Sequence, residues 1–144
     1  GAVDAQAAVS AAATYAPNTL GSYFVTRELR SEKINMSFGG LGAIENSLSI
    51  LEEGVVESIR IKLFAKHNKP NGLSIAVISP AGTRSVLLTP YNGYSSWDTS
   101  DYLELSSNAF YGESMKGEWK LEIKDHLPGD GGELNQWSIR VYGH

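Results

Sequence analysis

The 144-residue sequence contains no cysteine. This absence excludes disulfide bonds, thiolate metal sites and cysteine nucleophiles together. Long apolar runs are also missing. The longest one, residues 73–78, falls far short of the roughly 20 residues that a membrane-spanning helix needs. We therefore expect no membrane-embedded segment in this chain.

Clustered positive charge is missing as well. The sequence contains 12 Lys and Arg residues and 16 Asp and Glu residues, so the formal net charge is −4. Nucleic acids and anionic membrane surfaces are bound through gathered Lys and Arg side chains, so neither is an expected partner. The alanine-rich start lacks the basic region and initiating Met of a signal peptide. Because the chain starts at Gly1, we expect it to be a fragment of a longer polypeptide.

Residues 17–144 show the short alternating segments that are typical of β-strands. In residues 55–65, for example, Val55, Ile59 and Ile61 fall on one predicted apolar face. Turns rich in Gly and Pro, such as residues 79–83, separate these segments, and no helical pattern intervenes. The spacing predicts an all-β fold, an antiparallel jelly roll or β-sandwich of about eight strands.

Two tryptophan-bearing segments dominate the predicted core. Residues 117–125 and 132–143 each alternate apolar and polar side chains, with Trp119 and Trp137 on the apolar faces. A loop rich in Gly and Asp joins the two segments. We expect them to form a β-hairpin at the centre of the core. Truncating either indole should cost about 3–5 kcal/mol if the side chain is fully buried.

Residues 1–16 differ in composition from the rest, because eight of them are alanine. They predict a helix that ends before Pro17, with Asp4 near its positive amino end. An isolated helix of this length is marginally stable in water, so it should dock on another part of a longer protein. The predicted organisation is a helical segment over residues 1–16 and a β domain over residues 17–144.

Three motifs point to a known family. They are SPAGTRS at residues 79–85, YGESMKGEW at residues 111–119 and GELNQWSIRVYG at residues 132–143. In this order they resemble the P domain of kexin- and furin-like proprotein convertases, the domain that follows a subtilisin-like catalytic domain. Tyr111 stands where the family has a Trp, and Asn71-Gly72-Leu73 stands where animal convertases often carry Arg-Gly-Asp. Any role tied to that tripeptide does not transfer.

The start of the chain agrees with this resemblance. Residues 1–9, GAVDAQAAV, are similar to the last helix of subtilisin-like catalytic domains. The resemblance implies a catalytic-domain remnant over residues 1–16 and a P domain over residues 17–144. It favours a secreted bacterial serine endopeptidase as the parent protein. The implied function is to stabilise the catalytic domain of the same polypeptide or aid its folding, and we expect the chain to be a monomer.

A catalytic site of its own is not expected in this chain. The three histidines, His67, His126 and His144, lie in predicted loops or at the terminus. The sequence contexts in which subtilisin-like enzymes carry their catalytic Ser, His and Asp are absent. We therefore expect the fragment to be inactive and its parent protein to be the enzyme.

Acidic loop residues are candidate ligands for Ca²⁺, which takes about six to eight oxygen ligands. If the strands alternate in direction, the loops at residues 66–72, 90–101 and 126–133 project from one end of the sandwich. Four carboxylates gathered there would repel one another without a cation. The alternative is that they are ordinary solvated turn residues, and both interpretations stay open. The four candidates are Asp98, Asp101, Asp125 and Asp130.

Aromatic residues in the loop at residues 90–100 suggest an alternative function. Tyr91, Tyr94 and Trp97 are suited to stacking on a sugar ring or on a protein partner. The chain would then be a substrate- or polymer-binding module that directs the protease to collagen or polysaccharide. In the other interpretation, which we favour, Tyr94 and Trp97 fold back and cover one end of the sandwich.

Overall fold

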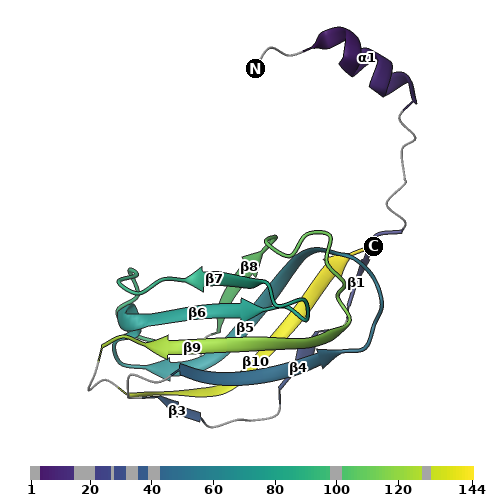
Figure 1. The fold of residues 1–144 in the computed structure, drawn as a ribbon. Helices are drawn as coiled ribbons and strands as arrows, with labels where there is room; N and C mark the ends of the chain where they lie inside the picture. The colour runs from purple at the N-terminus through teal and green to yellow at the C-terminus, as the bar shows by residue number, and fades with distance from the viewer. Residues whose placement is uncertain are drawn as a thin grey trace.

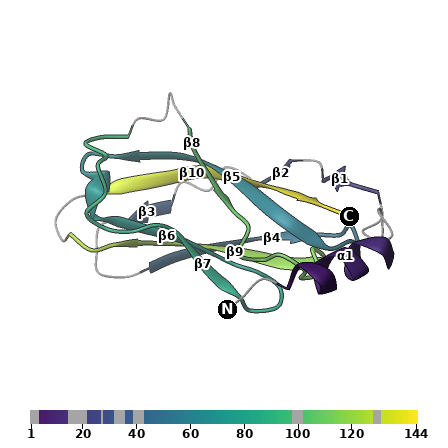
Figure 2. The same cartoon turned by 90° about the horizontal axis from the view of Figure 1, so that it is seen from above.

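Two antiparallel sheets pack face to face in the computed structural model (Figures 1 and 2). This arrangement confirms the predicted all-β sandwich. The structure describes residues 4–14, 22–26, 28–31, 36–38, 43–97, 102–127 and 131–144.

The order of the strands in each sheet defines the topology. The first sheet runs in the order β1 (Phe24–Val25), β10 (Gly132–Gly143), β5 (Val56–His67) and β8 (Leu103–Ser107), and β2 (Leu29–Arg30) and β3 (Met36–Phe38) also pair with β10. The second sheet runs in the order β4 (Ala43–Ile50), β9 (Gly117–Asp125), β6 (Leu73–Ile78) and β7 (Arg84–Leu88). A 3₁₀ turn, η1 (Pro70–Gly72), precedes β6.

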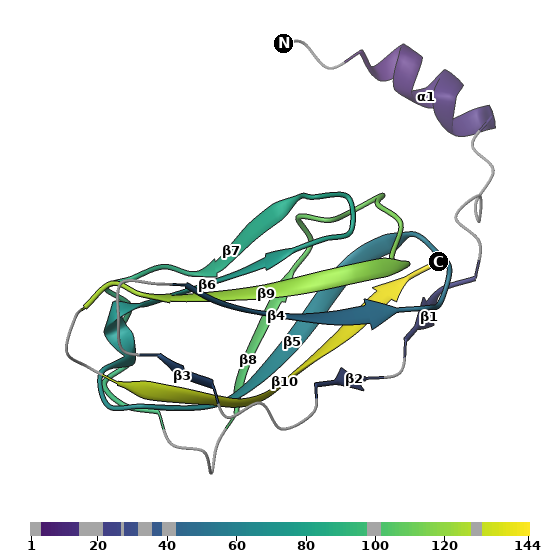
Figure 3. The same cartoon turned by 60° about the horizontal axis from the view of Figure 1, so that its bottom comes forward.

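The described residues form ten strands where the sequence predicts about eight. Three of the ten are short pieces at one edge of the first sheet. There β1, β2 and β3 pair in turn with successive stretches of β10, starting from its carboxyl end (Figure 3). These short pieces together cover the edge that β10 would otherwise expose.

The two tryptophans lie at the centre of the core, as predicted. Neither Trp119 nor Trp137 has any exposed surface. The Phe110 ring packs edge-on against Trp119, with 5.1 Å between the ring centroids. Trp119 Nε1 donates a hydrogen bond to the Met115 carbonyl (2.9 Å), and Trp137 Nε1 donates to Asn46 Oδ1 (2.7 Å). Each indole therefore buries its apolar area without leaving its polar atom unpaired.

The predicted hairpin between the two tryptophan strands is wrong. β9 pairs with β4 and β6 in the second sheet, whereas β10 pairs with β5 in the first sheet. The loop between them crosses from one layer to the other, a step of about 10 Å between packed sheets. This arrangement lets the apolar face of each strand cover the other. In a hairpin, the two strands would lie in one sheet, and their apolar faces would point to the same side of it.

The start of β5 also departs from the predicted alternation. Val56 is fully buried, whereas Val55 is only partly buried. The pairing with β10 moves from Ser58 opposite Tyr142 to Val56 opposite Gly143, which leaves Glu57 without an opposite residue. Such a β-bulge inserts one residue and changes which side chain faces inward. The predicted apolar face is therefore correct only from Ile59 onward.

The amino-terminal helix, α1 (Ala5–Thr14), stands apart from the sandwich (Figures 1 and 3). Asp4 caps it, because Asp4 Oδ1 accepts a hydrogen bond from the Ala7 amide (2.9 Å). None of its residues is buried. In the described part of the chain, no helix has the length and apolar character to cross a membrane. The domain boundary at residues 16 and 17 lies outside the described residues and stays a prediction.

Candidate functional site

Three loops meet at one end of the sandwich, as the strand directions predict. We call this region, formed by residues 67–73, 89–97 and 125–127, the loop end. The backbone of His67 pairs with that of Trp97 through two hydrogen bonds of 2.9 and 3.1 Å. The Asn92 side-chain amide donates to the Pro70 carbonyl (3.1 Å), and the His126 amide donates to the Gly72 carbonyl (3.0 Å).

A buried polar pair lies beneath these loops. The side chains of His67 and Asp125 are 0% and 1% exposed, and His67 Nε2 lies 3.3 Å from Asp125 Oδ2. The Lys69 amide donates to His67 Nδ1 (3.0 Å), so Nε2 carries the proton and donates to the carboxylate. The other oxygen of Asp125 accepts a hydrogen bond from the Leu127 amide (3.0 Å). The pair thus ties the end of β5 to the end of β9.

This geometry bears on the calcium prediction. Both carboxylate oxygens of Asp125 accept hydrogen bonds from protein donors, and each oxygen keeps a lone pair that is open to a cation. Asp98, Asp101 and Asp130 lie outside the described residues. Among the residues that the structure does describe, no group of three or more His, Asp or Glu is placed to hold a metal ion. Calcium binding by Asp98, Asp101, Asp125 and Asp130 stays a prediction.

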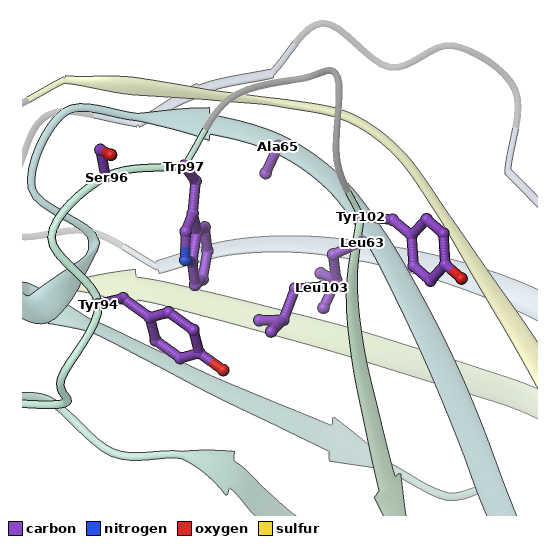
Figure 4. A pocket seen from close by; sticks show the side chains of 7 residues that line it. All are labelled: Leu63, Ala65, Tyr94, Ser96, Trp97, Tyr102 and Leu103. Atoms are coloured by element: carbon purple, nitrogen blue, oxygen red, sulfur yellow. The ribbon is translucent and has the colours of Figure 1, made fainter.

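The aromatic loop residues divide into two kinds. Trp97 packs against the hydrophobic core, and the Tyr94 ring lies edge-on to it at 5.6 Å between centroids (Figure 4). The favoured interpretation, in which the loop folds back over the end of the sandwich, is therefore confirmed for Trp97. Tyr91 is 80% exposed and has a positive φ of 62°.

A small cavity of about 230 Å³ opens beside Trp97 (Figure 4). The buried Nε1 of Trp97 has no hydrogen-bond partner among the described residues. Since this nitrogen has no accessible surface, the cavity itself offers mainly apolar walls, which suit an apolar ring. It is lined by Leu63, Ala65, Tyr94, Ser96, Trp97, Tyr102 and Leu103.

The opposite end of the sandwich is the place where the chain arrives from α1. We call this region, formed by residues 22–24, 51–55, 110–116 and 143–144, the linker end. The backbones of Val55 and His144 exchange two hydrogen bonds of 2.7 and 3.1 Å. Val56 and Met115 each add one hydrogen bond, from the Val56 amide to the Glu113 carbonyl (2.8 Å) and from the Met115 amide to the Gly54 carbonyl (3.0 Å). Segments far apart in sequence are thereby held together in a fixed arrangement.

Large apolar side chains are exposed at the linker end. Tyr23 is 60% exposed, Leu51 is 75% exposed and Tyr111 is 64% exposed. The sequence does not mark these residues as a group, because they come from three separate segments and share no spacing. The substitution of Tyr111 for the Trp of the family motif was the one signal that pointed to this region.

An ion-pair network on the outer face of the first sheet surrounds Glu28. The carboxylate accepts hydrogen bonds from Ser138 Oγ (2.8 Å) and Arg140 Nη2 (3.3 Å), and it forms an ion pair with Arg30 (3.2 Å). The Ser138 hydrogen bond, together with the charges of Arg30, Lys62 and Arg140, lowers the pKa of Glu28 below 4.5. This network links the segment before β2 to β10.

The fold and its two loop-bounded ends define an antiparallel β-sandwich domain of the jelly-roll type. The family model of the proprotein convertase P-domain matches residues 56–141, which is more than half of the sequence. The chain therefore belongs to the proprotein convertase P-domain family. P domains are the non-catalytic carboxyl-terminal domains of subtilisin/kexin-like serine proteases. This membership confirms both the resemblance and the expectation that the chain is not itself the enzyme.

Similar proteins agree with this membership. The chain is 32% identical to an extracellular serine protease of Aeromonas sobria, over 62% of this chain and 20% of that protein. It is 30% identical to the rat proprotein convertase subtilisin/kexin type 6, over 61% of this chain and 10% of that protein. The crystal structure of the A. sobria serine protease with its chaperone superposes with a TM-score of 0.78 at 25% identity, over 95% of this chain and 29% of that chain. The chain thus spans a fifth or less of the length of these two curated relatives.

Proposed function

We propose that this chain is the carboxyl-terminal P domain of a secreted serine endopeptidase, and that it stabilises the catalytic domain of the same polypeptide or aids its folding. One observation carries the proposal. The structural likeness to the A. sobria serine protease covers 95% of this chain but only 29% of that chain. In that protein, the matching domain has the rest of a serine protease as its covalent neighbour. Secretion is supported by a relative that is described as extracellular.

The physical basis of the proposed function is docking within one chain. A linker raises the effective concentration of one domain near the other to the millimolar range, so a modest interface is enough. Interfaces between domains of one chain bury about 600–1,500 Å². Because this contact exists only when both domains are folded, it raises the unfolding free energy of each of them.

The test uses the longer polypeptide with and without residues 17–144. We expect the truncated form to give less active protease and to lose activity at a lower temperature. A matched control replaces residues 17–144 with an unrelated β-sandwich of similar size, which should not restore either property. If the truncated polypeptide folds and resists heat as well as the intact one, the proposal is wrong.

The polymer-binding alternative rests on the 80% exposure of Tyr91 and on the cavity beside Trp97. It predicts that the isolated chain is retained on insoluble collagen or on a polysaccharide. Tyr91→Ala and Tyr94→Ala should weaken this retention, whereas Val86→Ala, another exposed site, should not. Absence of retention on every polymer tested would remove the alternative.

A further inference from the structure

We propose that the linker end is the surface on which the catalytic domain docks, with Tyr23, Leu51 and Tyr111 as its apolar contacts. The inference rests on the proposed function and adds the location of the contact. Four observations carry it: the length of the tether, the exposed apolar side chains, an unpaired carboxylate oxygen, and the fixed backbone of this end.

The tether limits where the catalytic domain lies. By the resemblance of residues 1–9, α1 belongs to that domain, and only residues 15–21 separate Thr14 from Ser22. Eight Cα-to-Cα steps reach at most about 29 Å. The 12 residues of β10 extend about 40 Å along the sandwich, from the loop end to the linker end. Thr14 is therefore held within about 29 Å of Ser22, beside the linker end, and cannot reach the loop end.

The side chains at the linker end suit a protein interface. Tyr23, Leu51 and Tyr111 leave most of their surface in water. Aromatic residues are enriched at the centres of interfaces, where they bury large areas at a low cost in conformational entropy. Exposed apolar residues from three different segments on one end form a surface whose burial would be favourable.

A polar atom at the same end is also left unpaired. Glu113 Oε2 is shielded from solvent and has no hydrogen-bond partner within the described part of the chain. An unsatisfied buried acceptor is unfavourable, and most such atoms in folded proteins are paired. Glu113 as a residue is partly exposed, so its carboxylate would turn outward on docking and accept a hydrogen bond from a donor of the docked domain.

The backbone of the linker end is preorganised for such a contact. Val55 is paired with His144, and Gly54 accepts a hydrogen bond from the Met115 amide. A Cβ at Gly54 would lie 2.5 Å from the Phe24 ring, and a Cβ at Gly143 would lie 1.9 Å from the Val55 carbonyl oxygen. The segments are packed too closely to rearrange freely, so docking requires little new ordering of the chain.

Hydrogen–deuterium exchange locates the contact without any substitution. The experiment compares the isolated chain with the longer polypeptide that carries it. We expect amide exchange in residues 51–55 and 110–116 to slow by about tenfold or more in the longer polypeptide. Residues 89–97, at the loop end, should exchange at the same rate in both. Protection confined to the loop end, or to the outer faces of the sheets, would overturn the inference.

Variants give the second test. In the longer polypeptide, Leu51→Ser and Tyr111→Ser should each raise the rate of thermal inactivation of the protease by about tenfold. Val86→Ser is the matched control, because Val86 is a 49% exposed aliphatic residue in the middle of the edge strand β7. In the isolated chain all three variants should melt within about 2 °C of the unsubstituted chain, because exposed side chains contribute little to its own stability.

The outcomes separate this inference from the proposed function. If removal of residues 17–144 destabilises the protease but the Leu51 and Tyr111 variants inactivate at the unsubstituted rate, the proposed function stands and the location is wrong. If removal has no effect and no amide of the chain is protected in the longer polypeptide, both fail.

Discussion

The indole N–H of Trp137 donates its hydrogen bond to a side chain from the opposite sheet. Its Nε1 donates to Asn46 Oδ1 at 2.7 Å, across the interface between the layers. Asn46→Ala should therefore lower the unfolding free energy by about 1–3 kcal/mol, because the buried indole N–H loses its acceptor. Ser47→Ala, at an exposed neighbouring position on the same strand, is the control and should be nearly neutral. Urea denaturation measures both, and equal stabilities would contradict the assigned role of Asn46.

Acid sensitivity should arise in part at Glu28. Its pKa is lowered from 4.5, chiefly by the Ser138 hydrogen bond. A lowered pKa contributes stability above the unfolded value, and this contribution is lost as the pH falls through the folded value. Glu28→Gln should thus be less stable than the unsubstituted chain at neutral pH, and the difference should shrink below about pH 4.5. Denaturation curves at several pH values test this prediction, with Glu118→Gln, at an exposed position, as the control.

Calcium binding has a thermal test. If the aspartate-rich loops hold Ca²⁺, a concentration 100 times the Kd should stabilise the chain by about 2.7 kcal/mol, and a chelator should reverse the effect. Asp130→Asn should weaken the response, and Mg²⁺ at the same concentration is the control. Identical melting curves in chelator and in millimolar Ca²⁺ would favour the interpretation of these residues as solvated turn formers.

At the scale of elements, the end of β10 packs tightly against the loop before β5. A methyl group at Gly143 would lie 1.9 Å from the Val55 carbonyl oxygen. Gly143→Ala should cost about 1–3 kcal/mol, because the two backbones must separate. Gly93→Ala is the matched control, since an added Cβ there meets no heavy atom within 4 Å. Chemical denaturation should show a large difference between the two variants, and equal midpoints would contradict the tight closure.

The pairing of elements is also where sequence reasoning reached its limit. Alternation in residues 117–125 and 132–143 correctly indicated two strands with inward-facing tryptophans. It did not indicate that β9 and β10 lie in different sheets, because a period of two identifies the buried face and not the neighbouring strand. The bulge at Glu57 shifted the inward face of β5 for a similar reason. The pattern of apolar positions does not show which residue of a strand lacks an opposite residue, so the bulge could not be predicted from it.

At the scale of the whole molecule, α1 contributes nothing to the core of the sandwich. None of its residues is buried, and Val9 is 70% exposed. Removal of residues 1–16 should therefore change the melting temperature by less than about 2 °C, which corresponds to less than about 0.5 kcal/mol. Differential scanning calorimetry of the two forms measures this change. A large loss of stability would mean that the helix packs on this domain and not on a preceding one.

The tryptophan alternation, the Gly- and Pro-rich turns and the absence of helical periods after residue 17 were sufficient to predict the sandwich, because these signals are local. The resemblance to the family came from the three sequence motifs. The gathering of three loops at one end followed from strand direction alone. Only the tertiary structure decided that His67 pairs with Asp125, that Trp97 folds inward, and that Tyr23, Leu51 and Tyr111 share one exposed end. Such contacts join residues that are far apart in the chain. Their positions depend on how the two sheets stack, and no sequence period records that stacking.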